Sequence, residues 1–253
     1  QLIRNSQIRT SLEALGYTSY AFETFWPFLN MEDADEYLQA SQDLAGIAWL
    51  GSPVSRFEFI ALQTTLLRPL LDTNEQFLKN FGSVLTTPER QHYDRILYQF
   101  DQLERIARAP GKKFVWAHIA APHPPLVFNP DGSFKTSDWE SGVSQELVYI
   151  NQRILAAIKT ILENAEVPPV IILQADHAWP TEKDRRMRIL NAYHLPGAGA
   201  DLLYPQITPV NSFRIVLNAY FGGQYDLLPD ESYYSLYGRP FDFQAVPLDC
   251  LSQ

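Results

Sequence analysis

The residues of this chain that are best suited to chemistry are Asp176 and His177, which follow the apolar run 170–173. Such runs of valine, isoleucine and leucine are typical of strands covered on both faces of a parallel sheet. Ligands of open α/β sheets bind just beyond the carboxyl ends of these strands, and carboxylates and imidazoles are common metal ligands. The pair therefore indicates a metal site. The alternative is a capped loop in which Asp176 accepts backbone hydrogen bonds and His177 is exposed.

Two more histidines lie at the end of another predicted strand, 113–119. His118 lies in that strand, and His123 lies between prolines in the loop 120–125. A helix predicted over 143–163 connects this strand to the one at 170–173, and such crossovers join parallel strands. We therefore expect both histidines at the same sheet edge as Asp176 and His177. The alternatives are a hydrogen-bonded core position for His118 and a purely structural loop position for His123.

The elements that must position these residues alternate along the chain. Apolar spacing and turn residues predict helices over 1–15, 88–109 and 209–221 and strands over 17–22 and 188–195, with an irregular region over 23–88. The helix that enters the strand at 17–22 through Gly16 resembles the second half of a β-α-β unit, so we expect its first strand upstream. We interpret His92 and His194 as structural or surface residues. The whole pattern predicts one α/β domain over 1–253.

Composition restricts the classes of function. The chain has 253 residues, 46% of them hydrophobic, and a net charge of -9, which argues against nucleic acid as a partner. An acidic protein that acts on an anionic substrate needs a local positive centre such as a metal ion. The single cysteine, Cys250, excludes an internal disulfide framework. No apolar run reaches the roughly 20 residues that span a bilayer.

Five segments carry a resemblance to a known family. The segment 114–125, FVWAHIAAPHPP, resembles the Pro-His-Pro-Pro segment of sulfatase-like proteins in the alkaline phosphatase superfamily. The most similar branch contains lipoteichoic acid synthases and phosphoglycerol transferases. The helix segment 149–153, the Asp-His pair, and the segments 189–196 and 204–214 follow in the order of that branch. The resemblance extends from residue 1 to about residue 235.

The resemblance implies a fold, an activity and a set of roles. The fold would be an α/β three-layer sandwich with a mostly parallel central sheet, alkaline-phosphatase-like, here without its N-terminal strand or strands. The activity would be metal-dependent hydrolysis or transfer of phosphate or sulfate esters. Asp176 and His177 would bind a divalent metal (Mn, Mg, Ca or Zn). His123 would contact the substrate or assist the leaving group, with His118 beside it in the substrate site.

Two departures from the family pattern leave other interpretations open. Ala178 stands where the family usually has glycine, and the first metal carboxylate and the hydroxyl or thiol nucleophile have no counterpart in a matching context. Thr10, Ser11, Thr86 and Thr87 are hydroxyls without a setting that suggests activation. We therefore expect a missing N-terminal segment to complete the site and this chain alone to be inactive, and whether it retains the metal stays open. The alternatives are a non-catalytic sulfatase-like module with a binding or assembly role, and an unrelated α/β binding protein.

The expected partners and location also come from the resemblance. A small anionic ester or a lipid head group would be the ligand, and the residues do not distinguish phosphate from sulfate. The branch implies an extracytoplasmic position, with a parent protein tethered to the membrane through upstream segments and this chain itself soluble. The sequence indicates no oligomeric state.

Overall fold

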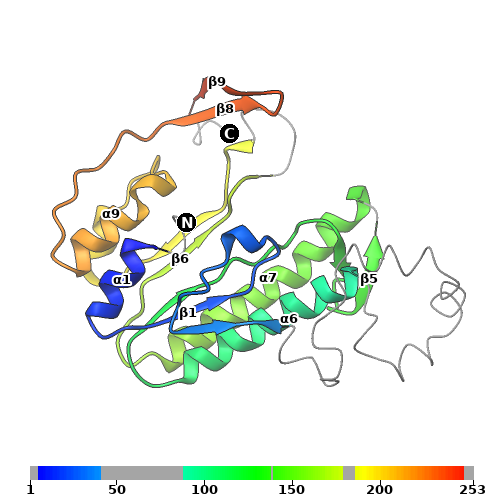
Figure 1. Ribbon diagram of the computed structural model, residues 1–253, viewed down its shortest axis with the longest axis horizontal. Coiled ribbons are helices and arrows are strands. Elements are labelled where there is room, and N and C mark those ends of the chain that lie inside the picture. The colour runs from blue at the N-terminus through cyan, green and yellow to red at the C-terminus, as the bar shows by residue number, and fades with distance from the viewer. Residues whose placement is uncertain (1–4, 41–87, 138, 179–185, 248–253) are drawn as a thin grey trace, which may run out of the picture. The chain divides into compact units, whose positions relative to one another are not determined.

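The computed structural model describes residues 5–40, 88–137, 139–178 and 186–247 (Figure 1). The chain forms two compact units, Gln1–Asn164 and Ala165–Gln253, and each is described by itself. The elements of the first unit are α1 (Gln7–Ala14), β1 (Thr18–Phe22), the 3-10 helix η1 (Pro27–Leu29), β2 (Glu36–Leu38), α6 (Pro88–Arg108), β3 (Lys113–Trp116), β4 (Leu126–Phe128), β5 (Phe134–Ser137) and α7 (Trp139–Asn164).

The first unit contains a parallel sheet with the strand order β2-β1-β3. Ala21 of β1 pairs with Tyr37 on one side and with Trp116 on the other, and both pairings are parallel. Ala21 and Phe22 are fully buried, as expected for the central strand. Helix α6 leads into β3 through Gly111, whose φ of +87° favours glycine. This sheet with its helices confirms the expected mixed α/β class.

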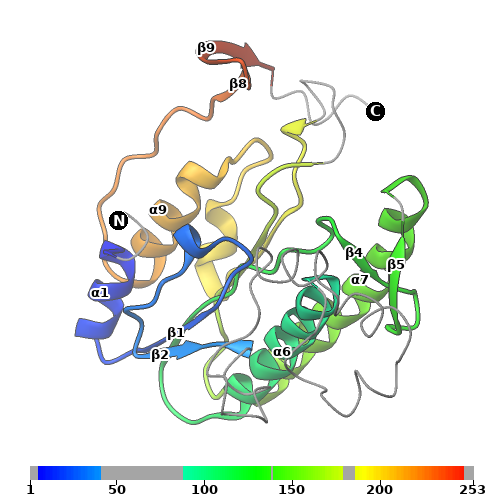
Figure 2. The ribbon, with the colours of Figure 1, turned by 45° about the vertical axis from the view of Figure 1, so that its right-hand side comes forward.

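Helices α6 and α7 lie side by side and carry the core of the first unit (Figures 1 and 2). The buried stripe of α6 includes Ile96 and Phe100, and that of α7 includes Ile150. Both stripes pack against Val127 and Phe128 of the β4–β5 hairpin. Both helices were predicted from the spacing of their apolar residues, although α7 begins at Trp139, before the predicted start. None of the helices described in the structure is long and apolar enough to cross a membrane.

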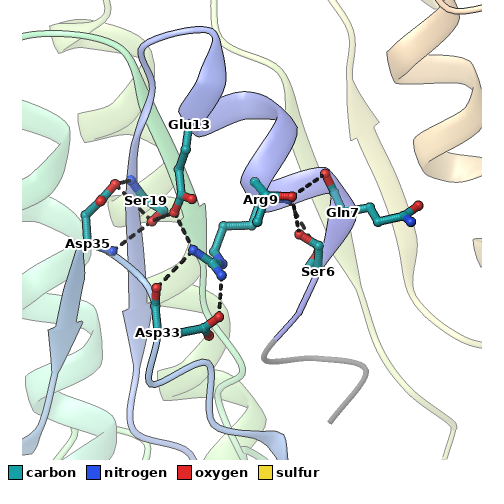
Figure 3. Close-up of polar contacts among 8 residues, drawn as sticks. Ser6, Gln7, Arg9, Glu13, Ser19, Asp33 and Asp35 are labelled. Carbon is teal, nitrogen blue, oxygen red and sulfur yellow. Dashed lines mark hydrogen bonds and ion pairs between the residues drawn. The ribbon is translucent and has the colours of Figure 1, made fainter.

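A buried ionic network fixes α1 to the sheet (Figure 3). The guanidinium group of Arg9 donates to Glu13 at 2.6 Å and to the carbonyl of Asp33 at 2.9 Å, and it also pairs with the Asp33 carboxylate. Ser19, fully buried in β1, bonds Glu13 and accepts the N–H of Asp35 at 2.9 Å. Each buried charge is therefore paired, which a low-dielectric interior requires.

The described part of the second unit contains two antiparallel strand pairs, a 3-10 helix and the α-helix α9. Its elements are β6 (Ile171–Gln174), β7 (Asn191–His194), the 3-10 helix η2 (Gly197–Leu202), α9 (Pro209–Tyr220), β8 (Ser232–Leu236) and β9 (Arg239–Val246). Strand β6 pairs with β7, from Ile171 opposite His194 to Gln174 opposite Asn191. Ile215 and Val216 of α9 form a small core with residues of this pair. Among the described strands, parallel pairing is therefore confined to β2-β1-β3. The expected parallel arrangement of the strands at 170–173 and 113–119 stays a prediction.

Candidate functional site

The carboxyl ends of β1 and β3 lie next to each other because the two strands pair in parallel register. The ring of His123 lies 4.9 Å from that of Trp26 and 5.6 Å from that of Phe25. The ring of His118 lies 5.6 Å from that of Trp26. The two predicted histidines therefore gather around the segment that follows β1. We call Phe25, Trp26, His118 and His123 the imidazole–aromatic cluster.

The backbone fixes the proton arrangement of His123. Its Nδ1 lies 2.7 Å from the carbonyl oxygen of Pro124, which can only accept a hydrogen bond. Nδ1 therefore carries a proton, and Nε2 of the neutral ring has a free lone pair. When the ring is protonated, Nε2–H becomes a donor for a bound molecule. The peptide bonds Ala121–Pro122 and Pro124–Pro125, on the two sides of His123, are both cis.

A polar stripe on α6 packs behind this cluster. His92, Arg95 and Gln99 follow helical spacing, and His92 and Gln99 are buried. The Gln99 Nε2 group donates to the carbonyl of Glu23 at 2.9 Å and to that of His118 at 3.3 Å. It thereby joins the two segments that leave β1 and β3. Arg95 Nε lies 3.7 Å from Glu23 Oε2, which places a cation beside that carboxylate.

His92 is a buried neutral imidazole. It is 1% exposed, and its ring lies 5.2 Å from that of Phe25. Burial lowers its pKa from 6.5 to about 4, with a smaller effect of Arg95 in the same direction. Backbone carbonyls of the loop that carries His123 oppose this shift, but neither ring nitrogen completes a hydrogen bond within the described part of the chain. The interpretation of His92 as a structural residue can therefore be stated more closely: its buried ring packs against Phe25 of the imidazole–aromatic cluster.

Glu146 of α7 anchors the strand that follows the His123 loop. It is fully buried, and its Oε2 accepts the N–H groups of Val127 at 2.7 Å and Phe128 at 3.2 Å. Burial raises the pKa of this carboxyl, while the two N–H donors oppose the rise. The carboxyl group thus holds β4 at its start, just beyond the loop.

Asp176 and His177 form a pair in the second unit. Asp176 Oδ1 accepts the N–H of His177 at 2.9 Å, and Asp176 Oδ2 lies 3.7 Å from His177 Nε2. Their side chains are 73% and 36% exposed. His177 Nδ1 lies 3.2 Å from the carbonyl of Ala178, which puts the proton on Nδ1 and leaves the Nε2 lone pair available. A carboxylate oxygen and a free imidazole nitrogen on adjacent residues fit a divalent cation chemically.

The donor set is nevertheless small. Among the residues that the structure describes, no group of three or more His, Cys, Asp or Glu side chains could hold a metal ion. A catalytic site of high affinity ordinarily has at least three protein ligands. His118 and His123 lie in one unit and Asp176 and His177 in the other, so their expected convergence stays a prediction.

Ala178, which stands where the sulfatase-like pattern has glycine, adopts an ordinary backbone conformation. Within the described ranges only glycines adopt positive φ, so Ala178 is outside the left-handed region. Its N–H donates to the carbonyl of Arg186 at 2.9 Å. Of the candidate hydroxyls, Thr10 donates back to helix carbonyls of Ser6 and Gln7, and Thr86 and Thr87 lie outside the described residues.

Several site residues were not found from the sequence. Phe25 and Trp26 lie in a region interpreted only as irregular, although they directly follow a predicted strand. Their position shortly after a predicted strand is the signal that could have located them, because ligands bind beyond the carboxyl ends of neighbouring parallel strands. Gln99 and Glu146 were missed because the helical pattern was followed through apolar residues alone.

Comparisons of this chain with protein families, with curated proteins and with solved structures find no match. The case for a function therefore depends on the geometry of each unit and on the motif resemblance.

Proposed function

We propose that this chain is part of a metal-dependent enzyme that hydrolyses or transfers phosphate or sulfate esters. The observation that carries the proposal is the contact of His118 and His123 with Trp26 at the carboxyl ends of two parallel strands. Ligands of α/β proteins bind at such edges. The imidazole–aromatic cluster offers a proton donor beside an apolar wall, which suits an organic ester with a charged head group.

His123 has the role of proton donor in this proposal. As a nucleophile bonds to phosphorus or sulfur and the bond to the ester oxygen breaks, the protonated ring of His123 gives its Nε2 proton to the departing oxygen, which leaves as an alcohol. Its Nδ1 is held by the carbonyl of Pro124, so the ring presents Nε2 to the ester. Asp176 and His177 would hold a divalent metal, which would supply positive charge for an anionic ester in a chain of net charge -9.

The wider proposal follows the motif resemblance. The fold is a three-layer, alkaline-phosphatase-like sandwich with a mostly parallel central sheet that further strands complete. A nucleophile and a first metal carboxylate come from polypeptide upstream of this sequence. The parent protein acts outside the cytoplasm, and its ligand is a phosphoglycerol-like head group or a comparable sulfate ester.

A second candidate is a non-catalytic sulfatase-like module that binds anionic esters without turning them over. The observation that favours it is the small donor set, because the described residues offer Asp176 and His177 but no cluster of three metal ligands. This candidate predicts ester binding that does not depend on added metal.

Metal titration tests the leading proposal. Calorimetric titration of the full chain with Mn²⁺ should give one saturable site, and Asp176→Asn or His177→Gln should weaken it at least tenfold, by about the effect expected for loss of one ligand. His194→Gln is the matched control, since His194 lies in the same unit with Nδ1 2.7 Å from the carbonyl of Pro169. Equal affinity in all four proteins would reject Asp176 and His177 as ligands.

Ester binding separates the two candidates. The chain has five histidines, so their imidazole NMR signals can be assigned from single His→Gln variants. Glycerol phosphate and methyl sulfate, titrated with and without Mn²⁺, should shift the signals of His118 and His123 and leave that of His194 unchanged. Shifts that require Mn²⁺ support the enzyme, metal-independent shifts support the binding module, and unchanged signals for His118 and His123 reject both.

A further inference from the structure

A hydrogen-bond network lies at the carboxyl end of β6 and is centred on Gln174. Its Nε2 lies 2.7 Å from Asn191 Oδ1, 2.9 Å from the Tyr193 hydroxyl and 2.7 Å from Ser212 Oγ. The hydroxyls of Tyr193 and Ser212 are themselves 2.7 Å apart. The two hydrogens of the Gln174 amide are thus shared among three acceptors, and Ser212 is only 1% exposed.

This network joins three elements of the second unit. Gln174 ends β6, Asn191 and Tyr193 belong to β7, and Ser212 lies in the first turn of α9. Asn191 also donates to the carbonyl of Ile207, just before α9, at 3.2 Å. A side chain bonded at once to a neighbouring strand and to a helix fixes the end of its own strand more firmly than ladder bonds alone.

The proposed metal ligands depend on this strand end. Asp176 is two residues beyond Gln174, and among the described residues the side chains of Asp176 and His177 hydrogen-bond to backbone groups of His177 and Ala178. The intervening backbone is held by the N–H of Ala175, which donates to the carbonyl of Leu190 at 2.9 Å. The position of the pair is therefore set by the end of β6.

We infer that Gln174 is a positioning residue that holds the carboxyl end of β6 so that Asp176 and His177 can bind a cation together. The inference rests on the proposed function, in which this pair binds the metal. Groups behind metal ligands commonly determine affinity, and their removal costs tenfold to hundredfold. The network also gives a physical role to Asn191, Tyr193 and Ser212, which lie in the two segments of the motif resemblance that follow the Asp-His pair.

The test compares Gln174→Leu with Asn218→Leu in the full chain. Asn218 is a matched control because its amide makes two hydrogen bonds, both of 2.8 Å, to the backbone of Tyr225 in the same unit. In metal-free protein, amide hydrogen exchange of Ala175 and Ala178 should accelerate about tenfold or more in Gln174→Leu and remain unchanged in Asn218→Leu. The Kd for Mn²⁺ should rise about tenfold to hundredfold in Gln174→Leu alone.

Tyr193→Phe removes a single hydroxyl and keeps the test informative if Gln174→Leu does not fold. It should change both quantities in the same direction by a smaller factor. The inference would be overturned if amide hydrogen exchange at Ala175 and Ala178 were unchanged in these variants. It would also be overturned if the exchange became faster but the Kd for Mn²⁺ stayed the same. If the wild type binds no Mn²⁺, the proposed function fails, and the exchange measurement alone then decides whether Gln174 holds this segment.

Discussion

Replacement of Glu146 by leucine is expected to loosen β4 and to lower the free energy of unfolding by about 2–6 kcal/mol. The Glu146 carboxyl is fully buried and accepts the N–H groups of Val127 and Phe128, which are both buried as well. Each buried N–H that loses its acceptor costs about 1–3 kcal/mol, and leucine supplies no acceptor. Leucine keeps most of the side-chain volume, so the loss measures the two hydrogen bonds rather than a cavity.

Glutamine at position 146 should behave differently because it keeps an acceptor oxygen. Burial raises the pKa of Glu146 above its ordinary value of 4.5. The folded protein therefore binds this proton more readily than the unfolded chain does. The contribution of Glu146 to stability is fully present below pH 4.5 and is lost as the pH rises through the folded pKa. The stability deficit of Glu146→Gln relative to wild type should accordingly shrink as the pH rises above 4.5.

Urea unfolding of wild type, Glu146→Gln and Glu146→Leu at pH 4.5 and pH 7.5 measures the stability loss in the leucine variant and the pH dependence in the glutamine variant. The contributions of other titrating groups cancel when each variant is compared with wild type at the same pH. Amide exchange at Val127 and Phe128 gives the local measurement, with faster exchange expected in the leucine variant. If Glu146→Leu were as stable as the wild type, the hydrogen-bond argument would be refuted. A deficit of Glu146→Gln that grows with pH would refute the direction of the pKa shift.

Three further predictions concern stability. Since burial lowers the pKa of His92 from 6.5 to about 4, the wild type should lose about 3 kcal/mol from this group between pH 6.5 and pH 4, and urea unfolding of His92→Phe should lack that component. Arg9→Met, which breaks a buried ionic network, should cost about 3 kcal/mol by urea unfolding, whereas Arg108→Met at an exposed pair should cost less than about 1 kcal/mol. Gly111→Ala and Gly132→Ala both place alanine at positive φ, but only at Gly132 would the methyl group strike a packed tyrosine ring, so thermal unfolding should show the larger loss there.

The long helices were the most predictable part of the fold. A repeated apolar spacing over many residues identified 88–109 and 143–163, and the structure has helices α6 at Pro88–Arg108 and α7 at Trp139–Asn164. Short strands were found to within a few residues, because their apolar runs are bounded by Gly and Pro. These signals are local, so a single sequence contains them.

The pairing of strands and the burial of polar side chains could not be predicted from local sequence patterns. The place of Trp26 beside His123 depends on the register between β1 and β3, which are far apart in the sequence. The antiparallel pairing of β6 with β7 likewise depends on tertiary contacts. A buried polar residue such as Gln99 gives no periodic apolar signal, since its burial is stabilised by carbonyl acceptors that only the fold brings near.

In each unit, a hydrogen-bonded polar side chain lies next to the accessible candidate residues and holds a neighbouring strand in place. His123 lies on a loop whose following strand is bonded by the buried Glu146, and Asp176 and His177 follow a strand end bonded through Gln174. Buried polar groups destabilise a core unless they are hydrogen-bonded, and at both anchoring positions the side chain makes hydrogen bonds that an apolar side chain could not make. Their presence next to the candidate residues is what a chain needs when it must hold a reactive side chain in one place. The proposed roles of His123 and of the Asp176–His177 pair therefore predict that loss of either anchor disturbs the segment that follows it.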